Sequence, residues 1–329
     1  MSRLFIVLGL SLLSGCATLQ TGGSGAVFDF AIVGDNPYKE ASFPRYDRMI
    51  AEINAQSPAF VIHVGDMKSG GSSCGDDNFQ TLRRIHDQFT SPFVLTPGDN
   101  DWFDCSRPSA GGFEPGNRLT ALRKLFYPNP SSTLGAPMPV ISQSATPGYE
   151  AFVENVRFKR GDVHFATVHA VGVSPKNIKH PAHTEVMAAA FAWLDTVFAQ
   201  ANADDANGVF LATHVDVWVQ SGMPDLIKLY SRAPRVRTGY EAFNDALAHH
   251  AAVFPGQILL ALGDTHVYRV DKPLYHPDTG KLLANFTRVE PFGDDEVHWV
   301  RVRVDESTSE VFGVHQEFVQ ANIIDSRTP

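Results

Sequence analysis

This 329-residue sequence predicts an α/β fold with a mostly parallel sheet. Apolar, β-favouring runs alternate along the chain with segments of helical periodicity, which is the pattern of strand–helix–strand units. Four of these runs stop at a Gly-Asp pair, and the aspartates are Asp35, Asp66, Asp99 and Asp264. Because ligands of open α/β folds bind at the edge where parallel strands end, the four aspartates are predicted to form one site.

The composition fits one domain that buries a sizeable core. Hydrophobic residues make up 43% of the chain, which contains 23 phenylalanines, as expected of a globular protein. Because Asp35 and Asp264 lie far apart in the sequence, a site that contains both requires a single domain. We expect this domain at residues 28–318, followed by a tail at 319–329. The net charge of -9, with no basic stripe, excludes nucleic acid as an expected partner. The sequence does not indicate an oligomeric state.

The N-terminus is interpreted as a targeting segment. An apolar run at residues 4–13 is too short to span a membrane. It leads into Leu-Ser-Gly-Cys16, which resembles the lipobox of bacterial lipoproteins. The resemblance implies removal of a signal peptide at residues 1–15, a lipid on Cys16 as the membrane contact, and a place in the bacterial cell envelope. Ala17 favours the outer membrane facing the periplasm, with residues 16–27 as a flexible tether. A plain signal peptide with an incidental cysteine is the alternative.

Strands and helices alternate in the first third of the chain. The second of the predicted helices has Asp76 or Asp77 available as a cap. The predicted strands each lead into a motif aspartate, and they lie at residues 28–33, 59–64 and 92–96, with helices at 43–54 and 77–89.

Two irregular insertions interrupt the later alternation. Residues 102–149 are rich in Pro, Gly and Ser, and a loop of this length is usually a lid or a binding loop, with a structural insertion as the alternative. Residues 216–239 form the second insertion. The remaining predicted elements are helices at 117–127, 184–201 and 240–250, and strands at 151–159, 163–169, 208–213, 257–262, 281–289, 297–304 and 310–316.

Ligand-type side chains follow the predicted strands in order. Besides the four aspartates, His214 ends one strand and His266 lies two residues after Asp264. Carboxylates and imidazoles that converge on one edge suit a pair of divalent metal ions, with one aspartate bridging both. Any single aspartate is explained as readily by ordinary turn chemistry. Taken together, the predicted metal ligands are Asp35, Asp66, Asp99, His214, Asp264 and His266.

This order resembles the motifs of the calcineurin-like metallophosphoesterases over about residues 28–269. That family reads D-x-H, G-D, G-N-H-[DE], a lone His at a strand end, and G-H-x-H. Asp35 matches the first Asp, Asp66 the bridging Asp, His214 the lone His and His266 the last His. The resemblance implies a four-layer α/β/β/α sandwich. It also implies hydrolysis of a small-molecule phosphate ester, in which a hydroxide bridging two metals attacks phosphorus.

Several motif positions depart from the family pattern. Pro37 stands at the His of D-x-H, Asp99 at the Asn ligand, and Asp264 at the first His of the last motif. The added carboxylates bring two dications and their ligands to a formal charge of about zero. Such an oxygen-rich site favours Mn, Mg, Fe or Ca over Zn. A neutral site also attracts a dianionic phosphate monoester less strongly, so a phosphate diester or a non-phosphate ester becomes more plausible.

The proton donor and the substrate-binding residues are less clearly marked. Asn100 stands where the family has a proton-donating His, and its amide can hydrogen-bond a phosphate oxygen. Asp101 and His169 are the other candidates for proton donation. Candidates for binding an anionic substrate, with solvated surface positions as the alternative, are Lys68, Arg235 and Arg237.

A non-catalytic role is the strongest alternative. The chain would then be a lipid-anchored binding or scaffold module with a structural metal, and the family histidines replaced at Pro37 and Asn100 favour this reading. The D-x-D at residues 99–101 also resembles that of haloacid dehalogenase-type phosphatases. Their motif normally follows the apolar run directly, whereas a Pro-Gly pair intervenes here, so we consider this class a poor match.

We predict a disulfide between Cys74 and Cys105. Three cysteines leave one to explain in an exported protein, and lipidation of Cys16 accounts for it. The other two follow motif loops expected at one edge, and an oxidising compartment favours their pairing. The bond should stabilise the fold by about 3–4 kcal/mol in the chain-entropy model. Intact mass with and without reductant should show no free thiol in the mature protein, and two thiols before reduction would contradict the pairing.

Overall fold

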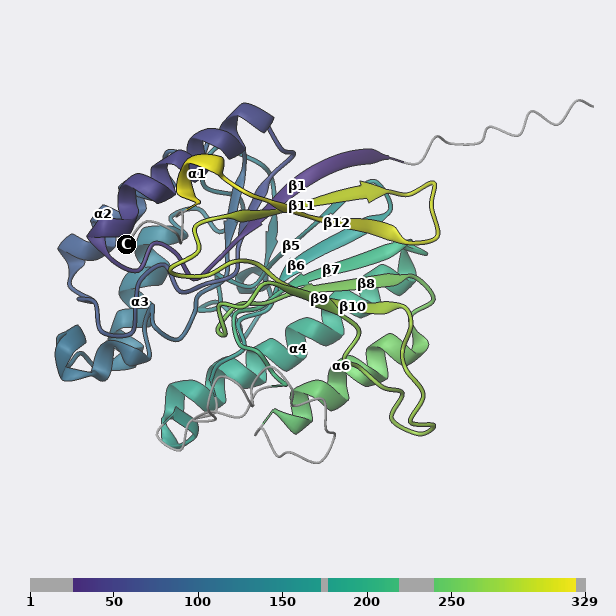
Figure 1. Cartoon of the computed structure of the whole chain (residues 1–329). Coiled ribbons are helices and arrows are strands. Elements are labelled where there is room, and N and C mark those ends of the chain that lie inside the picture. The colour runs from purple at the N-terminus through teal and green to yellow at the C-terminus, as the bar shows by residue number, and fades with distance from the viewer. Residues whose placement is uncertain (1–25, 173–176, 219–239, 324–329) are drawn as a thin grey trace, which may run out of the picture.

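Two β-sheets pack face to face in the computed structural model, which describes residues 26–172, 177–218 and 240–323 (Figure 1). Helices cover the outer face of each sheet, so the layers follow the order α/β/β/α. In the described residues the first sheet has the strand order β12-β11-β1-β2-β3 and the second β4-β5-β6-β7-β8-β10-β9. This arrangement confirms the predicted four-layer sandwich.

The elements have the following bounds. The first sheet contains β1 (Val27–Val33), β2 (Val61–His63), β3 (Phe93–Leu95), β11 (Trp299–Asp305) and β12 (Val311–Glu317). The second contains β4 (Ile141–Ser142), β5 (Val156–Arg160), β6 (Val163–Thr167), β7 (Gly208–Ala212), β8 (Gln257–Ala261), β9 (Arg269–Asp271) and β10 (Phe286–Glu290). The helices are α1 (Phe43–Gln56), α2 (Asp76–His86) and α3 (Pro115–Phe126) beside the first sheet, and α4 (Pro181–Ala203) and α6 (Glu241–Val253) beside the second.

The strand β1 is buried on both faces. Its residues Phe30 and Ile32 point into the core between the sheets, whereas Ala31 and Val33 pack with the helices of the first sheet. The Phe30 ring meets Phe165 of the second sheet edge-to-face, with 5.5 Å between ring centroids. Such aromatic pairs stabilise a core beyond the area that they bury, so phenylalanine joins the two sheets.

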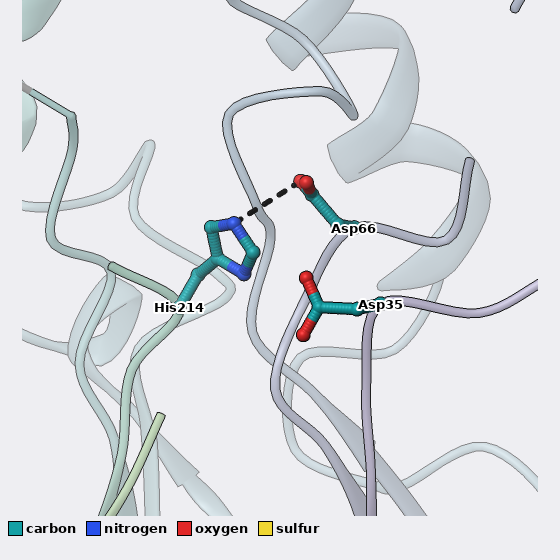
Figure 2. A group of neighbouring side chains, drawn as sticks. All are labelled: Asp35, Asp66 and His214. Atoms are coloured by element: carbon teal, nitrogen blue, oxygen red, sulfur yellow. Dashed lines mark ion pairs between the residues drawn. The ribbon is translucent and has the colours of Figure 1, made fainter. Parts of the chain in front are cut away.

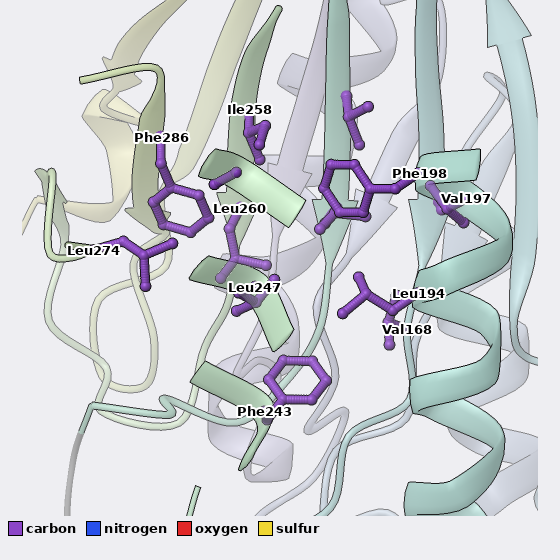
Figure 3. Close-up of a cluster of buried hydrophobic side chains, with 14 of the residues drawn as sticks. Val168, Leu194, Val197, Phe198, Phe243, Leu247, Ile258, Leu260, Leu274 and Phe286 are labelled. Carbon is purple, nitrogen blue, oxygen red and sulfur yellow. The ribbon is translucent and has the colours of Figure 1, made fainter. Parts of the chain in front are cut away.

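The outer core of the second sheet forms between α4, α6 and the strands (Figure 3). Leu194 and Phe198 of α4 and Leu247 of α6 belong to the same buried cluster as Ile258 and Leu260 of β8. Burying a side chain of this size contributes about 1.5–3 kcal/mol. These contacts hold the two helices against the strands that lead into the second half of the site.

Parallel pairing brings the motif loops to one edge. Strands β1, β2 and β3 run parallel, as do β6, β7, β8 and β10. Antiparallel pairing joins β11 and β12 to the first sheet and β4, β5 and β9 to the second. A mostly parallel sheet was predicted, whereas the described strands form as many antiparallel as parallel pairs, because the edge strands of both sheets pair antiparallel. The loops after β1, β2, β3, β7 and β8 follow the parallel strands and emerge where ligands of such strands bind.

Several strands are shorter in the structure than predicted, and two of them begin well after their predicted start. The strand expected at 151–159 begins only at Val156, because the residues before it form a turn. The strand expected at 281–289 begins only at Phe286, because Asn285 turns the chain by donating from Nδ2 to carbonyls at the end of α6.

The first insertion is part of the packed fold. Leu122 and Phe126 of α3 are buried with residues of α1 and α2. The Glu114 side chain caps α3 by accepting from the backbone N–H groups of Gly116 and Asn117, which satisfies donors that a helix start leaves open. Neither Asp76 nor Asp77 caps α2, since Gly75 holds that position and both carboxylates lie in the first turn. Across the three described ranges, every helix falls short of the length and hydropathy that a membrane crossing requires.

Candidate metal centre

The backbone turns sharply where the strands end. Asp35, Asp66, Asp264 and His266 have positive φ angles of 52°, 55°, 79° and 60°. Non-glycine residues rarely adopt this conformation, although Asp and His tolerate it better than most. Such residues cluster at functional sites, where the surrounding structure enforces them.

Three predicted ligands converge at this edge (Figure 2). Asp35 and Asp66 come from the first sheet and His214 from the second, and one ligand atom of each lies within 4.8 Å of the others. All three side chains are buried. The His214 Nε2 atom lies 3.3 Å from Asp66 Oδ1. Its Nδ1 lies 3.0 Å from the Val64 carbonyl oxygen, which orients the ring with Nε2 towards the carboxylates.

This triad has the donor chemistry of a divalent cation site. Among the described residues, His214 Nε2 is buried without a hydrogen-bond partner and has only its ion-pair contacts with the Asp66 and Asp99 carboxylates, whereas buried polar atoms normally have a hydrogen bond. Burial raises the pKa of Asp35 well above its usual range, with His214 opposing this rise and Asp66 adding to it. A divalent cation would replace the repulsion with attraction and give Nε2 a partner. The residues therefore fit a metal ion.

The other predicted ligands lie around the triad. Asp99 Oδ1 is 3.9 Å from His214 Nε2, and burial also raises the pKa of Asp99 well above its usual range. The backbone N–H of Asp264 donates to both carboxylate oxygens of Asp35, at 3.2 and 3.3 Å. His266 Nε2 lies 3.6 Å from Asp35 Oδ1. The structure thus brings all six residues to one edge, and their individual roles as ligands stay predictions.

Tyr38 belongs to this cluster and was not predicted. Its hydroxyl oxygen lies 3.0 Å from Asp66 Oδ2, 3.3 Å from Asp35 Oδ1 and 2.9 Å from His266 Nε2. It follows directly after Pro37, the position where the family has a histidine. A polar aromatic residue beside a lost ligand is the signal that could have identified it. The phenol oxygen adds one more hard donor to the edge.

Asn100 and Asp101 hold the Asp66 loop in place. The backbone N–H of Asn100 donates to Asp66 Oδ1 at 3.0 Å, and its Nδ2 contacts Asp66 Oδ2. The buried Asp101 carboxylate accepts from the N–H groups of Asp66, Met67 and Gly98 at 2.8–2.9 Å. Burial and the neighbouring Asp66 raise the pKa of Asp101 to about 7, while the Gly98 N–H and Lys68 lower it. Since both Asp101 oxygens are bonded to backbone, its geometry fits a loop clamp better than a proton donor.

His169 lies in a separate buried group. Its Nδ1 is 2.8 Å from Glu154 Oε1, and its Nε2 accepts from Trp102 Nε1 at 3.2 Å. Glu154 is also paired with Arg123. Both ring nitrogens are therefore engaged within the protein, which favours a structural role, and proton donation by His169 stays a prediction.

Of the three residues predicted to bind an anionic substrate, the structure describes only Lys68. Lys68 is only 1% exposed, so the alternative of a surface lysine is wrong, and its Nζ donates to the Ser69 carbonyl at 3.0 Å. Burial lowers the pKa of Lys68 below its usual value. Arg235 and Arg237, like the proposed lipid-bearing Cys16, lie outside the described residues.

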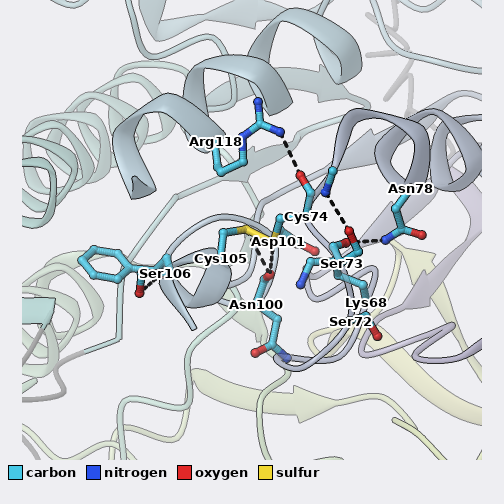
Figure 4. The surroundings of a disulfide bond; sticks show 12 residues. Lys68, Ser72, Ser73, Cys74, Asn78, Asn100, Asp101, Cys105, Ser106 and Arg118 are labelled. Carbon is cyan, nitrogen blue, oxygen red and sulfur yellow. Dashed lines mark hydrogen bonds between the residues drawn. A yellow bond between two sulfur atoms is a disulfide. The ribbon is translucent and has the colours of Figure 1, made fainter. Parts of the chain in front are cut away.

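A disulfide joins Cys74 and Cys105, as predicted, with 5.6 Å between the Cα atoms (Figure 4). Both sulfurs lie 4.0 Å from the Asn100 carbonyl oxygen. The Asn100 side chain points away from the sulfurs. The bond therefore braces the loop that carries Asn100 and Asp101 against the loop that follows Asp66.

Solved structures share this fold at low sequence identity. The chain is similar to the structure of PhoD, with a TM-score of 0.51 and 13% identity over 88% of this chain and 68% of that one. It is also similar to a dimetal phosphatase from Danio rerio, with a TM-score of 0.48 and 11% identity over 89% and 99% of the two chains. A third is GAP50, the anchor in the inner membrane complex of Plasmodium, with a TM-score of 0.48 and 13% identity over 92% and 90%. No curated protein matches the chain in sequence.

A family model establishes the class of protein. The model of the calcineurin-like phosphoesterases matches residues 28–268, which is most of the chain. The chain therefore belongs to the calcineurin-like phosphoesterase family. Membership confirms the resemblance read from the motifs and supports, in general terms, a metal-dependent phosphoester hydrolase.

The buried Glu154 makes the fold sensitive to acid. Burial alone would raise its pKa, but Arg123 and His169 outweigh burial and lower the pKa to about 2. Because the folded-state pKa lies below the unfolded value of about 4.3, the stabilisation is present above about pH 4 and is lost as the pH falls towards 2. We expect the wild type to lose on the order of 3 kcal/mol of unfolding free energy over this window through Glu154.

The variant Glu154→Gln tests this expectation by urea unfolding at a series of pH values. It should be less stable than the wild type near neutral pH, because Arg123 loses its charged partner, and should show a weaker fall in acid. The same change at the exposed Glu185 of α4 is the matched control and should keep the wild-type profile. If Glu154→Gln keeps the wild-type dependence of unfolding free energy on pH, Glu154 is not the source of the acid sensitivity.

Proposed function

We propose that this protein hydrolyses phosphate esters at the edge formed by Asp35, Asp66 and His214, with two divalent cations as cofactors. The observation that carries the proposal is the buried triad, whose His214 Nε2 lacks a hydrogen-bond partner among the described residues. Either a monoester or a diester fits this general chemistry. Oxygen donors outnumber imidazoles around the triad, which supports Mn, Mg, Fe or Ca over Zn.

The protein residues would bind and orient the reactants. Divalent cations in this site would supply Lewis-acid activation of water and neutralise charge that develops on the phosphoryl group. Asp66 is fixed for this purpose from two directions, by the Asn100 N–H and by the clamp at Asp101. Tyr38 connects Asp35, Asp66 and His266 through its hydroxyl. A substrate with a good leaving group would need no proton donor.

We further propose that the domain is tethered in the bacterial cell envelope by a lipid on Cys16, at the outer membrane facing the periplasm. The support is the lipobox-like sequence at residues 13–16. The disulfide between Cys74 and Cys105 also suits an oxidising compartment.

A non-catalytic metal-binding module is the second candidate. One observation favours it: the Asn100 amide and the Tyr38 hydroxyl both contact Asp66 Oδ2, and the amide donates to the hydroxyl at 3.4 Å. A site whose polar groups satisfy one another is compatible with a single structural cation.

Metal binding should raise the melting temperature, because a cation that binds the folded state stabilises it by mass action. At a free metal concentration of about 100 Kd the gain is about 2.7 kcal/mol, which corresponds to several degrees for a domain of this size. EDTA should reverse it. Elemental analysis near two Mn, Mg or Fe per chain would support the hydrolase, and one Ca would support the module.

The variant Asp66→Asn separates the site from the fold. It should lose both the metal-dependent rise in melting temperature and the turnover of phosphate esters. It should still fold without metal, because it removes one charge from a crowded acidic cluster. Asp47→Asn, the same change on the exposed face of α1, is the control and should behave as the wild type. Full turnover in Asp66→Asn would overturn the assignment of the site.

A further inference from the structure

Arg107 lies on a well-fixed loop beside the metal centre. The loop begins just after Cys105, which the disulfide ties to Cys74. The backbone N–H of Arg107 donates to the Asp104 carbonyl at 2.9 Å, and the Arg107 carbonyl accepts from Gly112 at 3.0 Å. The position of the Arg107 backbone is therefore set by covalent and hydrogen-bonded contacts.

The Arg107 side chain reaches back over Gly70 towards Asn100. A Cβ atom placed on Gly70 would lie 2.1 Å from Arg107 Nη1 and 2.6 Å from Asn100 Oδ1. Because both distances start from one point, Nη1 and Oδ1 lie within about 4.7 Å of each other. A side chain at position 70 would therefore have to displace the guanidinium or the amide from these positions.

The guanidinium combines order with access. Its Nη2 forms an ion pair with Asp104, which orients the planar group, and the side chain is still 51% exposed. Its charge is also felt at Lys68, so two cations lie close together here. An arginine stays charged at any working pH and binds phosphate oxygens in a fork of two hydrogen bonds.

Asn100 connects this cation to the metal triad. Its Nδ2 contacts Asp66 Oδ2, while its Oδ1 lies beside Arg107. A phosphoryl group bound through a divalent cation at Asp66 would therefore have an arginine one side chain away. Two dications and four carboxylates have a formal charge of about zero. Arg107 adds a positive charge beside them and so favours an anionic substrate.

We propose that Arg107, positioned over Gly70 and next to Asn100, binds the terminal phosphoryl group of a phosphate monoester. The proposal rests on the proposed phosphoesterase function and names its substrate class. A monoester dianion carries one more negative charge than a diester and presents three non-bridging oxygens, so it gains more from a guanidinium. This reverses the preference for a diester inferred from the ligand charges alone.

Steady-state kinetics of the full chain with Mn²⁺ test the proposal, with 4-nitrophenyl phosphate as the monoester and bis(4-nitrophenyl) phosphate as the diester. Loss of a hydrogen bond to a charged group costs about 1.5–3 kcal/mol. We therefore expect Arg107→Ala to raise the monoester KM by about tenfold or more, with little change in kcat. The diester KM should change much less, and Arg107→Lys should restore part of the monoester affinity.

Two further variants separate recognition from folding and from general charge effects. Gly70→Ala keeps the arginine but fills the space that its guanidinium occupies, so it should raise the monoester KM as Arg107→Ala does. Arg84→Ala removes the same charge from the exposed surface of α2 and should leave both KM values unchanged. Thermal melting of each variant confirms that it is folded. A monoester KM unchanged in Arg107→Ala, or a diester KM raised by the same factor, would overturn the proposal.

Calorimetric titration of the Mn²⁺-supplemented protein with inorganic phosphate measures the affinity of the anion site directly, so this test does not depend on turnover. If the wild type hydrolyses neither ester, the proposed function fails, but phosphate binding that Arg107→Ala weakens still supports the anion site. Phosphate binding of equal strength in the wild type and in Arg107→Ala overturns it, as does a wild type that binds no phosphate.

Discussion

Burying several carboxylates side by side is the constraint on which the rest of this structure depends. Asp35 and Asp66 are 0% and 2% exposed, and charges in such a place repel strongly unless a cation or a proton intervenes. The protein holds them there with backbone donors, from Asp264 to Asp35 and from Asn100 to Asp66. Those donors lie in the loops that follow β8 and β3, and the parallel strands of the two sheets hold these loops in place.

Buried polar residues connect the motif loops to one another. Asp101 joins the loops after β2 and β3 through three backbone N–H groups. His63 accepts from the Gly65 N–H and lies 3.1 Å from the Asn36 carbonyl, so it connects the loops after β1 and β2. The disulfide adds a covalent brace on the outer side. Polar groups held this firmly need little rearrangement when a ligand binds. In enzymes, such preorganised groups stabilise the transition state without a cost of reorganisation.

The sequence predicted the frame of this site because strand ends leave a strong local signal. An apolar run that breaks at Gly-Asp marks both the end of a buried strand and a carboxylate at the sheet edge, so Asp35 and Asp66 were identified directly. Burial of Lys68 left no such signal, since its neighbours in sequence do not reveal what packs over it. The group of Arg123, Glu154 and His169 depends on contacts between distant segments. The residues before Val156 begin with a short apolar run, as a strand often does, but they form a turn, so the local pattern gave the wrong boundary.

The ligands of the centre come from both sheets, and this divides the site across the inter-sheet core. Asp35 and Asp66 follow strands of one sheet, and His214 follows a strand of the other. The layer of Phe30, Phe60 and Phe165 sets how far apart the two sheets stand. This aromatic layer therefore helps to hold the two halves of the metal centre in position relative to each other, although none of its residues is a predicted ligand. The geometry of a polar site thus depends partly on the packing of the hydrophobic core.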